Sequence, residues 1–290
     1  GSAHTYTWNP GSLIGAVQNV NPGTTTTYTV VGTNTLSGCT NSATALVTVN
    51  TLPTANAGPT RTLTCANTST TLAGSGGGSY NWSGPGITAG GTTAAPTINL
   101  PGSYVLTVTS VNGCTATANT SVTQNTTVPS PTASNSGTLT CLTSTVSLTG
   151  GPGTGVTYQW SGPGFVGGTT SQNAIANAAG AYSLKVTDAI NGCTNTAVTS
   201  VIQNTTTPSP TASNSGALTC TTPTVGLTGG PGTGVTYQWS GPSFSGGTTA
   251  QNAIANAAGS FTLKVTSSAN GCTNTAVTSV SQNTTTPVAT

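Results

Sequence analysis

An internal repeat of just under 80 residues is the feature that most constrains how this chain can fold. Each complete repeat carries LTC near its start and NGC near its end; these motifs place cysteines at Cys65, Cys141 and Cys220, and at Cys114, Cys193 and Cys272. Cys141 and Cys220 are 79 residues apart, and so are Cys193 and Cys272. A fixed period of this kind is typical of a tandem array, in which each repeat is one small domain.

The repeat boundaries predict a domain organisation. Three complete repeats run over 51–127, 128–206 and 207–285, hereafter repeats 1, 2 and 3. Residues 1–50, the partial repeat, match only the second half of a repeat, and 286–290 resemble the start of a next one. We therefore expect both ends to be cuts in a longer array.

Short alternating runs predict that each repeat is built from β-strands. Repeat 2 contains TVSLTG, VTYQW, YSLKVTD and TNTAVTSV, separated by turns such as GGPGTG and NG. Such runs between Gly- and Pro-rich turns are typical of antiparallel sheets. About seven strands in under 80 residues indicate an all-β class, a small antiparallel sandwich in each repeat, and an elongated rod for the array.

The near-absence of charge excludes several classes of function. The charged residues are Arg61, Lys185, Lys264 and Asp188, and His4 is the single histidine. Nucleic-acid binding needs clusters of Lys and Arg, and so does a polybasic membrane patch. No apolar run approaches the roughly 18 residues of a membrane-spanning helix. We expect neither nucleic-acid binding nor membrane insertion.

Catalysis and cofactor binding lack the necessary residues as well. General acid–base chemistry needs paired carboxylates or a positioned histidine, and a calcium-stiffened linker needs several carboxylate oxygens. Two thiols without a histidine cannot complete a zinc site in any repeat. The sequence therefore predicts no enzyme activity, no cofactor and no metal.

Two cysteines in each complete repeat, 49 to 52 residues apart, predict one disulfide within each repeat. The expected pairs are Cys65–Cys114, Cys141–Cys193 and Cys220–Cys272. Cys39 has no partner in the partial repeat, which fits a cut array; an interchain bridge is the alternative. Disulfides form in oxidising compartments, so we expect an extracellular protein.

The four tryptophans share one environment in the sequence. Trp8, Trp82, Trp160 and Trp239 each follow a tyrosine by two positions, so both rings point to one face of a strand. That face is either the interior of the sandwich or an exposed platform for sugars. We interpret the indoles as core residues, because no carboxylate accompanies them to bind sugar hydroxyls.

The motifs TYxWSGPG, (A/P)GxYxLxVT, NGCTxTAxxxV and QNTTxPxPTASNSGxLTC together cover essentially the whole chain. In this combination the chain resembles the tandem Ig-like/PKD-like modules of very large secreted surface proteins of Bacteroidota. Many of those are type IX secretion cargo, including adhesins of the gliding-motility type. The resemblance implies an extracellular array of Ig-like sandwiches in a stalk, adhesin or filament.

Two hypotheses of function follow. The first is a non-catalytic structural rod, whose partners are its own neighbouring repeats or further copies in a fibre, since little charge repulsion keeps copies apart. The second is an adhesive module that binds a glycan or a solid surface through exposed Tyr and Trp rings.

Overall fold

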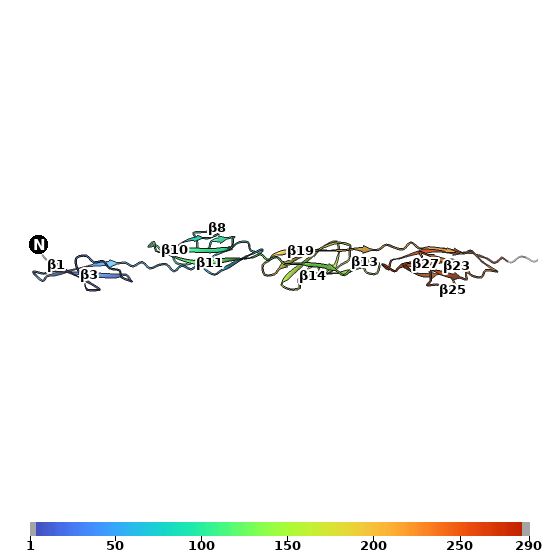
Figure 1. Cartoon of the computed structure of the whole chain (residues 1–290), viewed down its shortest axis with the longest axis horizontal. Coiled ribbons are helices and arrows are strands. Elements are labelled where there is room, and N and C mark those ends of the chain that lie inside the picture. The colour runs from blue at the N-terminus through green and yellow to red at the C-terminus, as the bar shows by residue number, and fades with distance from the viewer. Residues whose placement is uncertain (1–3, 286–290) are drawn as a thin grey trace, which may run out of the picture. The chain divides into compact units, whose positions relative to one another are not determined.

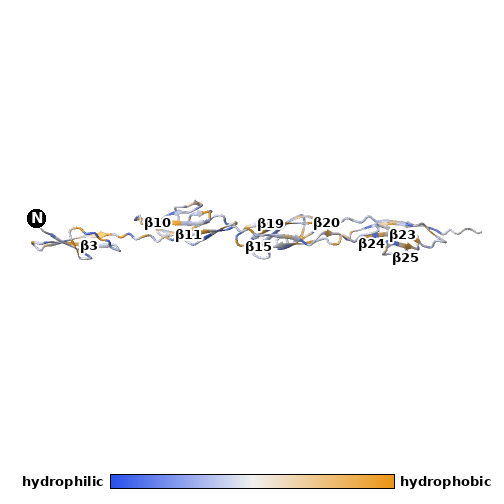
Figure 2. Ribbon diagram, viewed as in Figure 1, coloured by the Kyte–Doolittle hydropathy of each residue, from blue (hydrophilic) through white to orange (hydrophobic). Residues whose placement is uncertain are grey.

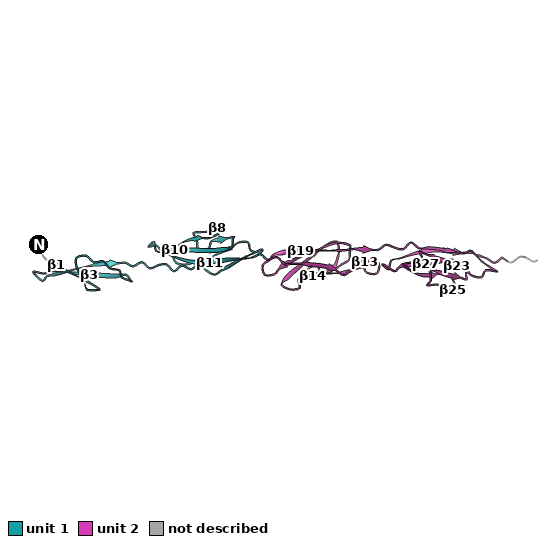
Figure 3. Cartoon of the chain, in the orientation of Figure 1, with its two compact units in different colours: residues 1–126 teal, residues 127–290 magenta. Residues whose placement is uncertain are grey.

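The computed structural model describes residues 4–285, and every regular element in them is a β-strand. The chain folds as tandem antiparallel β-sandwiches, the all-β class that the sequence predicts. It divides into two compact units, residues 1–126 and 127–290 (Figure 3). The expected start of a next repeat at 286–290 lies outside the described residues.

Repeat 2 shows the full sandwich (Figure 1). Its strands are β12 (Thr132–Asn135), β13 (Leu139–Thr140), β14 (Val146–Gly151), β15 (Val156–Ser161), β16 (Phe165–Gly167), β17 (Asn173–Ala176), β18 (Gly180–Asp188), β19 (Thr194–Val201) and β20 (Gln203–Asn204). One sheet has the order β12-β14-β17-β16 and the other β15-β18-β19. The short strand β13 pairs in parallel with β20, at the end of the repeat.

Repeat 3 reproduces this topology and register. Its strands are β21 (Thr211–Asn214), β22 (Leu218–Thr219), β23 (Val225–Gly230), β24 (Val235–Ser240), β25 (Phe244–Gly246), β26 (Asn252–Ala255), β27 (Gly259–Ser267), β28 (Thr273–Val280) and β29 (Gln282–Asn283). The sheets are β21-β23-β26-β25 and β24-β27-β28, with the parallel pair β22-β29.

Repeat 1 is a variant with fewer strands. They are β5 (Arg61–Thr64), β6 (Thr70–Thr71), β7 (Ser79–Ser83), β8 (Ile87–Ala89), β9 (Thr97–Ile98), β10 (Gly102–Thr109) and β11 (Thr115–Asn125). The sheets are β5-β11-β10-β7 and β6-β9-β8. As in repeats 2 and 3, the strand before the LTC cysteine pairs in parallel with the end of the repeat: β5 pairs with the last residues of β11.

The described part of the partial repeat forms a single sheet of order β2-β1-β3-β4. Its strands are β1 (His4–Asn9), β2 (Leu13–Ile14), β3 (Thr26–Asn34) and β4 (Thr40–Val47). The pairing of β1 with β3 and of β3 with β4 matches that of β15, β18 and β19 in repeat 2. These strands therefore correspond to the second sheet of a complete sandwich.

Period-two alternation builds the cores. Along β18, Tyr182, Leu184 and Val186 are fully buried, whereas the residues between them are at least partly exposed. Val146 and Leu148 on β14 of the other sheet belong to the same core. Figure 2 shows hydrophobic residues dispersed along the strands throughout the chain. Each of the three large cores lies within one sequence repeat, at 57–122, 139–201 and 218–280.

In two repeats, a buried tyrosine on the strand before the NGC hairpin forms hydrogen bonds with the backbone of neighbouring loops. The hydroxyl of Tyr182 lies 2.8 Å from the carbonyl oxygen of Gly164 and 2.7 Å from that of Ala178. Tyr104 makes the corresponding contacts with the carbonyls of Pro85 and Leu100, and burial raises the pKa of its hydroxyl. Phe261 occupies the same place in repeat 3 and is equally buried, but has no hydroxyl to donate.

This difference predicts opposite effects of two substitutions. Tyr182→Phe should lower the free energy of unfolding by about 1 kcal/mol, because the partly buried hydrogen bonding of its hydroxyl to the carbonyls of Gly164 and Ala178 is lost. Phe261→Tyr should raise it by a similar amount, because repeat 3 presents the corresponding carbonyls. Urea denaturation followed by far-UV circular dichroism measures both. A neutral Tyr182→Phe together with a destabilising Phe261→Tyr would contradict this account.

Candidate functional site

The most distinctive site in the second unit is a disulfide that crosses from one repeat to the next. Cys141, in repeat 2, is bonded to Cys272, in repeat 3. The two residues are 131 positions apart in sequence, and their Cα atoms are 5.0 Å apart. The disulfide thus joins the end of one sandwich to the beginning of the next.

The turn after the LTC motif presents Cys141. The backbone N–H of Thr140 donates to the carbonyl of Thr143 at 2.9 Å. In return, the hydroxyl of Thr140 accepts hydrogen bonds from the N–H groups of Leu142 and Thr143, at 3.2 and 3.0 Å. A threonine side chain that bonds its own local backbone in this way stabilises a tight turn. The cysteine is therefore held on a rigid support, next to the parallel pair β13-β20.

The NGC motif forms the tip of the hairpin that joins β27 to β28. Ser267 N–H donates to the carbonyl of Cys272 at 2.8 Å, and Gly271 N–H donates to the carbonyl of Ser267 at 2.9 Å. Gly271 has φ +67°, a left-handed conformation that glycine adopts without steric cost. An added Cβ at this position would also stand 2.2 Å from Cγ of Leu142 in the preceding repeat. Glycine thus serves both the turn and the close approach between repeats.

Asn270 connects the hairpin to the linker between the two repeats. Its side-chain amide donates to Oδ1 of Asn204 at 2.9 Å and to the carbonyl of Thr206 at 2.8 Å. Its own oxygen accepts the N–H of Cys272 at 3.0 Å. Asn274 adds a hydrogen bond to the carbonyl of Pro208 at 3.1 Å. All of these groups are uncharged. Hydrogen bonds and the disulfide therefore hold the junction, without any ion pair among these groups.

The predicted disulfides within repeats are wrong. Cys141 is bonded to Cys272, which excludes both Cys141–Cys193 and Cys220–Cys272. Cys65–Cys114 is excluded too, because Cys65 and Cys193 are each disulfide-bonded and Cys114 is a free thiol.

The physical reason is the length of the sandwich. Thr140 pairs with Asn204 at the end of the last strand, whereas Cys193 stands just before the start of β19. At about 3.3 Å per residue, the extended chain from Cys193 to Asn204 covers roughly 35 Å. A disulfide needs Cα atoms within about 7 Å of each other, so the two cysteines of one repeat cannot meet. The spacing of the cysteines in the sequence does not distinguish the two ends of a sandwich.

Cys39, Cys114 and Cys220 are the free cysteines among residues 4–285; Cys39 and Cys220 are exposed and Cys114 is partly buried. Cys39, which the sequence leaves unpaired, is thus a thiol in the structure. The expectation that Cys114 and Cys220 form disulfides is not met.

The indoles lie inside the sandwiches. Trp82, Trp160 and Trp239 are 5%, 4% and 2% exposed, which agrees with the interpretation of these residues as core. Trp8, in the single sheet of the partial repeat, is partly buried. The indole N–H of Trp82 donates to the carbonyl of Thr93 at 3.0 Å. The three buried rings do not form a platform for sugars.

The first glycine of the GGPGTG motif makes room for the tryptophan. A Cβ on Gly150 would lie 2.6 Å from Cδ2 of Leu184 and 3.3 Å from Cζ2 of Trp160. Gly229 has the same relation to Leu263 and Trp239, with the same two distances. The duplicated GGPGTGVTYQWSGP segment is therefore a repeated structural part of the core.

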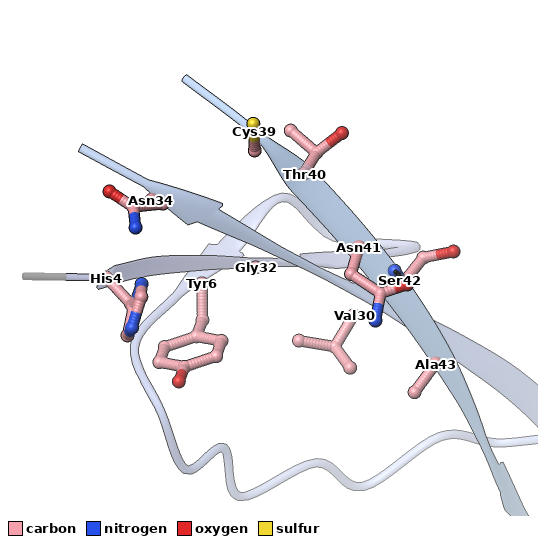
Figure 4. A pocket seen from close by; sticks show the side chains of 10 residues that line it. All are labelled: His4, Tyr6, Val30, Gly32, Asn34, Cys39, Thr40, Asn41, Ser42 and Ala43. Carbon is pink, nitrogen blue, oxygen red and sulfur yellow. Dashed lines mark hydrogen bonds between the residues drawn. The ribbon is translucent and has the colours of Figure 1, made fainter. Parts of the chain in front are cut away.

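The partial repeat carries an open hollow on one face of its sheet (Figure 4). Its lining includes His4, Tyr6, Val30, Asn34 and Cys39. In Figure 4 the rings of His4 and Tyr6 point to the same side of the sheet, and the sulfur of Cys39 points away from them. No carboxylate lies among the lining residues, so the hollow does not offer an acid–base pair.

Among residues 4–285, no group of three or more His, Cys, Asp or Glu side chains is placed to hold a metal ion. No helix of the length and apolarity needed to cross a membrane is found in this part of the chain.

No protein-family profile matches the chain, and no curated protein matches it by sequence. Solved structures give weak likenesses. A Ca2+-stabilized adhesin of an Antarctic bacterium that binds ice is 15% identical, with 98% of this chain and 91% of that chain covered and a TM-score of 0.49. The I9–I11 tandem of titin is 11% identical, with 80% and 99% covered and a TM-score of 0.34. The fold assignment rests on the strand pairings above.

The Cys141–Cys272 disulfide leads us to expect that replacing its cysteines destabilises the second unit, whereas replacing a free cysteine does not. Replacing Cys141 and Cys272 by Ser should lower the free energy of unfolding of the second unit by roughly 4–5 kcal/mol, because a long loop is no longer closed in the unfolded chain. Urea denaturation measures the effect. The control, Cys220→Ser, changes an exposed free thiol and should cost less than about 0.5 kcal/mol. Equal losses in both variants would contradict the assignment.

Burial of the indole predicts the outcome of Trp160→Ala. The substitution should cost about 3–5 kcal/mol, since it empties the centre of the repeat 2 core. Val198→Ala on β19 is the matched control, because Val198 is 64% exposed. Chemical denaturation and a glycan array are run on both variants. A fully stable Trp160→Ala that has lost binding to a glycan would favour the exposed-platform hypothesis instead.

Proposed function

We propose that this chain is a non-catalytic, load-bearing segment of an extracellular surface protein, in which successive β-sandwich repeats are linked covalently end to end. The observation that carries the proposal is the Cys141–Cys272 disulfide. A disulfide within a repeat would stabilise one domain. This disulfide joins two domains, and it therefore determines the path that a pulling force takes through the chain.

The position of the disulfide determines the path of a pulling force. Cys141 lies near the start of repeat 2 and Cys272 near the end of repeat 3, 131 positions apart in sequence. Because the covalent path through the sulfur atoms is far shorter than the path through the backbone, tension passes across the disulfide. The segment 142–271, which contains most of both cores, is then protected from complete extension.

The surroundings of the protein follow from the same chemistry. Four disulfide-bonded cysteines support an oxidising, extracellular location. The resemblance to the modules of secreted Bacteroidota surface proteins supports a stalk, adhesin or filament, with type IX secretion as the route. A surface with few charges and many Thr, Ser and Asn residues supports association with further copies in a fibre, because repulsion between copies is small.

Enzyme activity and glycan binding through aromatic rings receive less support. The side chains needed for acid–base chemistry are lacking from the lining of the hollow on the partial repeat. Three of the four indoles are buried, and the hydroxyls of Tyr158 and Tyr237 are occupied by the carbonyls of Pro152 and Pro231. A structural role accounts for the same residues without a ligand.

Single-molecule pulling of the full chain tests the load path. The background carries Cys65→Ser and Cys193→Ser, so that Cys141–Cys272 is the disulfide that remains. Adding Cys141→Ser should lengthen the fully extended chain by about 450 Å, because the 131 positions from Cys141 to Cys272 then extend by about 3.5 Å each.

Cys114→Ser in the same background is the control and should leave the extended length unchanged, since Cys114 is a free thiol. An extended length that does not differ between the background and its Cys141→Ser derivative would refute the load path.

A further inference from the structure

Each hairpin tip of the second unit carries an asparagine followed by a glycine, at Asn191–Gly192 and at Asn270–Gly271. This dipeptide is chemically unstable wherever the chain is free to move. Because glycine has no Cβ, its backbone nitrogen readily reaches the side-chain carbon Cγ of the asparagine and displaces the amide nitrogen as ammonia. The NGC motif therefore places a site of spontaneous deamidation directly before each cysteine of these hairpins.

The closed junction between repeats 2 and 3 holds the reacting groups of this site in hydrogen bonds. The amide nitrogen of Asn270 donates to Oδ1 of Asn204 at 2.9 Å and to the carbonyl of Thr206 at 2.8 Å, and the residue is 5% exposed. The nucleophile is engaged as well, because Gly271 N–H donates to the carbonyl of Ser267 at 2.9 Å. These hydrogen bonds must break before the ring can close, so the closed junction slows the reaction.

The Cys141–Cys272 disulfide and these hydrogen bonds connect the same two elements. Cys272 lies two residues after Asn270 and donates its N–H to the side-chain oxygen of Asn270 at 3.0 Å. On the side of repeat 2, Asn204 pairs with Thr140, the residue before Cys141. The disulfide therefore keeps the hairpin tip beside the acceptors of its amide. Without the disulfide, the two elements separate more easily and the amide is released more often.

We propose that Asn270 is a masked deamidation site, which becomes reactive when the Cys141–Cys272 disulfide is opened. The disulfide then has a second role besides carrying tension, because it protects the asparagine beside it. This modification is independent of the load path, since it depends on the disulfide and on the hydrogen bonds around Asn270. The reactants other than the chain are water and hydroxide from the solvent.

The reaction consumes one water and releases one ammonia, with no change of oxidation state. A solvent base takes the proton from the backbone nitrogen of Gly271, and this nitrogen attacks Cγ of Asn270. The amide nitrogen leaves as ammonia, with a proton from the solvent, and a succinimide ring remains. Attack of water at Cγ then restores the normal backbone as aspartate, whereas attack at the backbone carbonyl carbon gives isoaspartate.

The product prevents the junction from closing again. A carboxylate at position 270 has no N–H to donate, and it would face Oδ1 of Asn204 and the carbonyl of Thr206, which are both acceptors. Burial of an ionised group opposite two acceptors is unfavourable. Deamidation of Asn270 therefore converts a reversible opening of the junction into a permanent one.

Peptide mapping of the full chain by mass spectrometry, after incubation at mildly alkaline pH, tests the proposal. Replacing Cys141 and Cys272 by Ser removes the disulfide and should speed the deamidation of Asn270 about tenfold or more. Asn191 is the internal control, because its amide donates to the carbonyl of Thr127 at 2.9 Å, it is 2% exposed, and Cys193 beside it stays disulfide-bonded. Its rate should not change.

The reciprocal variant carries Cys65→Ser and Cys193→Ser, which replace the two other disulfide-bonded cysteines. Here Asn191 should react faster and Asn270 should not. In urea with dithiothreitol both should react at similar rates, because their local sequences, INGC and ANGC, are nearly identical.

The pattern of rates decides between local release and unfolding. Acceleration of Asn270 alone in the first variant, with acceleration of Asn191 alone in the second, supports the proposal. An unchanged rate at Asn270 in the first variant would overturn it. Equal acceleration of both asparagines in that variant would also overturn it, because the second unit would then have unfolded as a whole. So would an Asn270 that stays intact in urea with dithiothreitol.

Discussion

The parallel pairing of a two-residue strand with the end of the last strand determines the covalent structure of this chain. Leu139 and Thr140 pair with Gln203 and Asn204, and the next residue is Cys141. The pairing holds that cysteine at the end of its own sandwich, far from the other cysteine of the repeat. The first thiol within reach belongs to the hairpin of the following repeat. Thus a pair of backbone contacts converts a set of separate small domains into a linked series.

The other contacts at the junction between repeats 2 and 3 also hold the two repeats together, and they are all made by uncharged groups. Asn270 binds the linker, a threonine hydroxyl holds the LTC turn, and Gly271 allows the close approach of Leu142. Each is a short-range interaction that depends on geometry rather than on charge, which suits a chain with four charged residues. Salt screening acts on interactions between charges and has little to act on here.

Inside each sandwich, the core is small and depends on a few large side chains. One tryptophan, one buried Tyr or Phe and a handful of Leu, Val and Ala residues fill each complete repeat. Domains below about 80 residues have thin cores, so a crosslink contributes a large share of their stability. Placing that crosslink between repeats makes the stability of one repeat depend on its neighbour.

The amino-acid sequence alone determined the all-β class, the repeat period and the placement of the indoles in the core, because period-two alternation and Gly/Pro turns act locally. The identity of the cysteines that meet was decided by the tertiary structure. Cys141 is closer in sequence to Cys193 than to Cys272, and counting two cysteines per repeat favours the nearer pair. Sequence spacing does not say at which end of a sandwich a residue lies. Only the pairing of β13 with β20 places Cys141 at the far end, beside the hairpin of the next repeat.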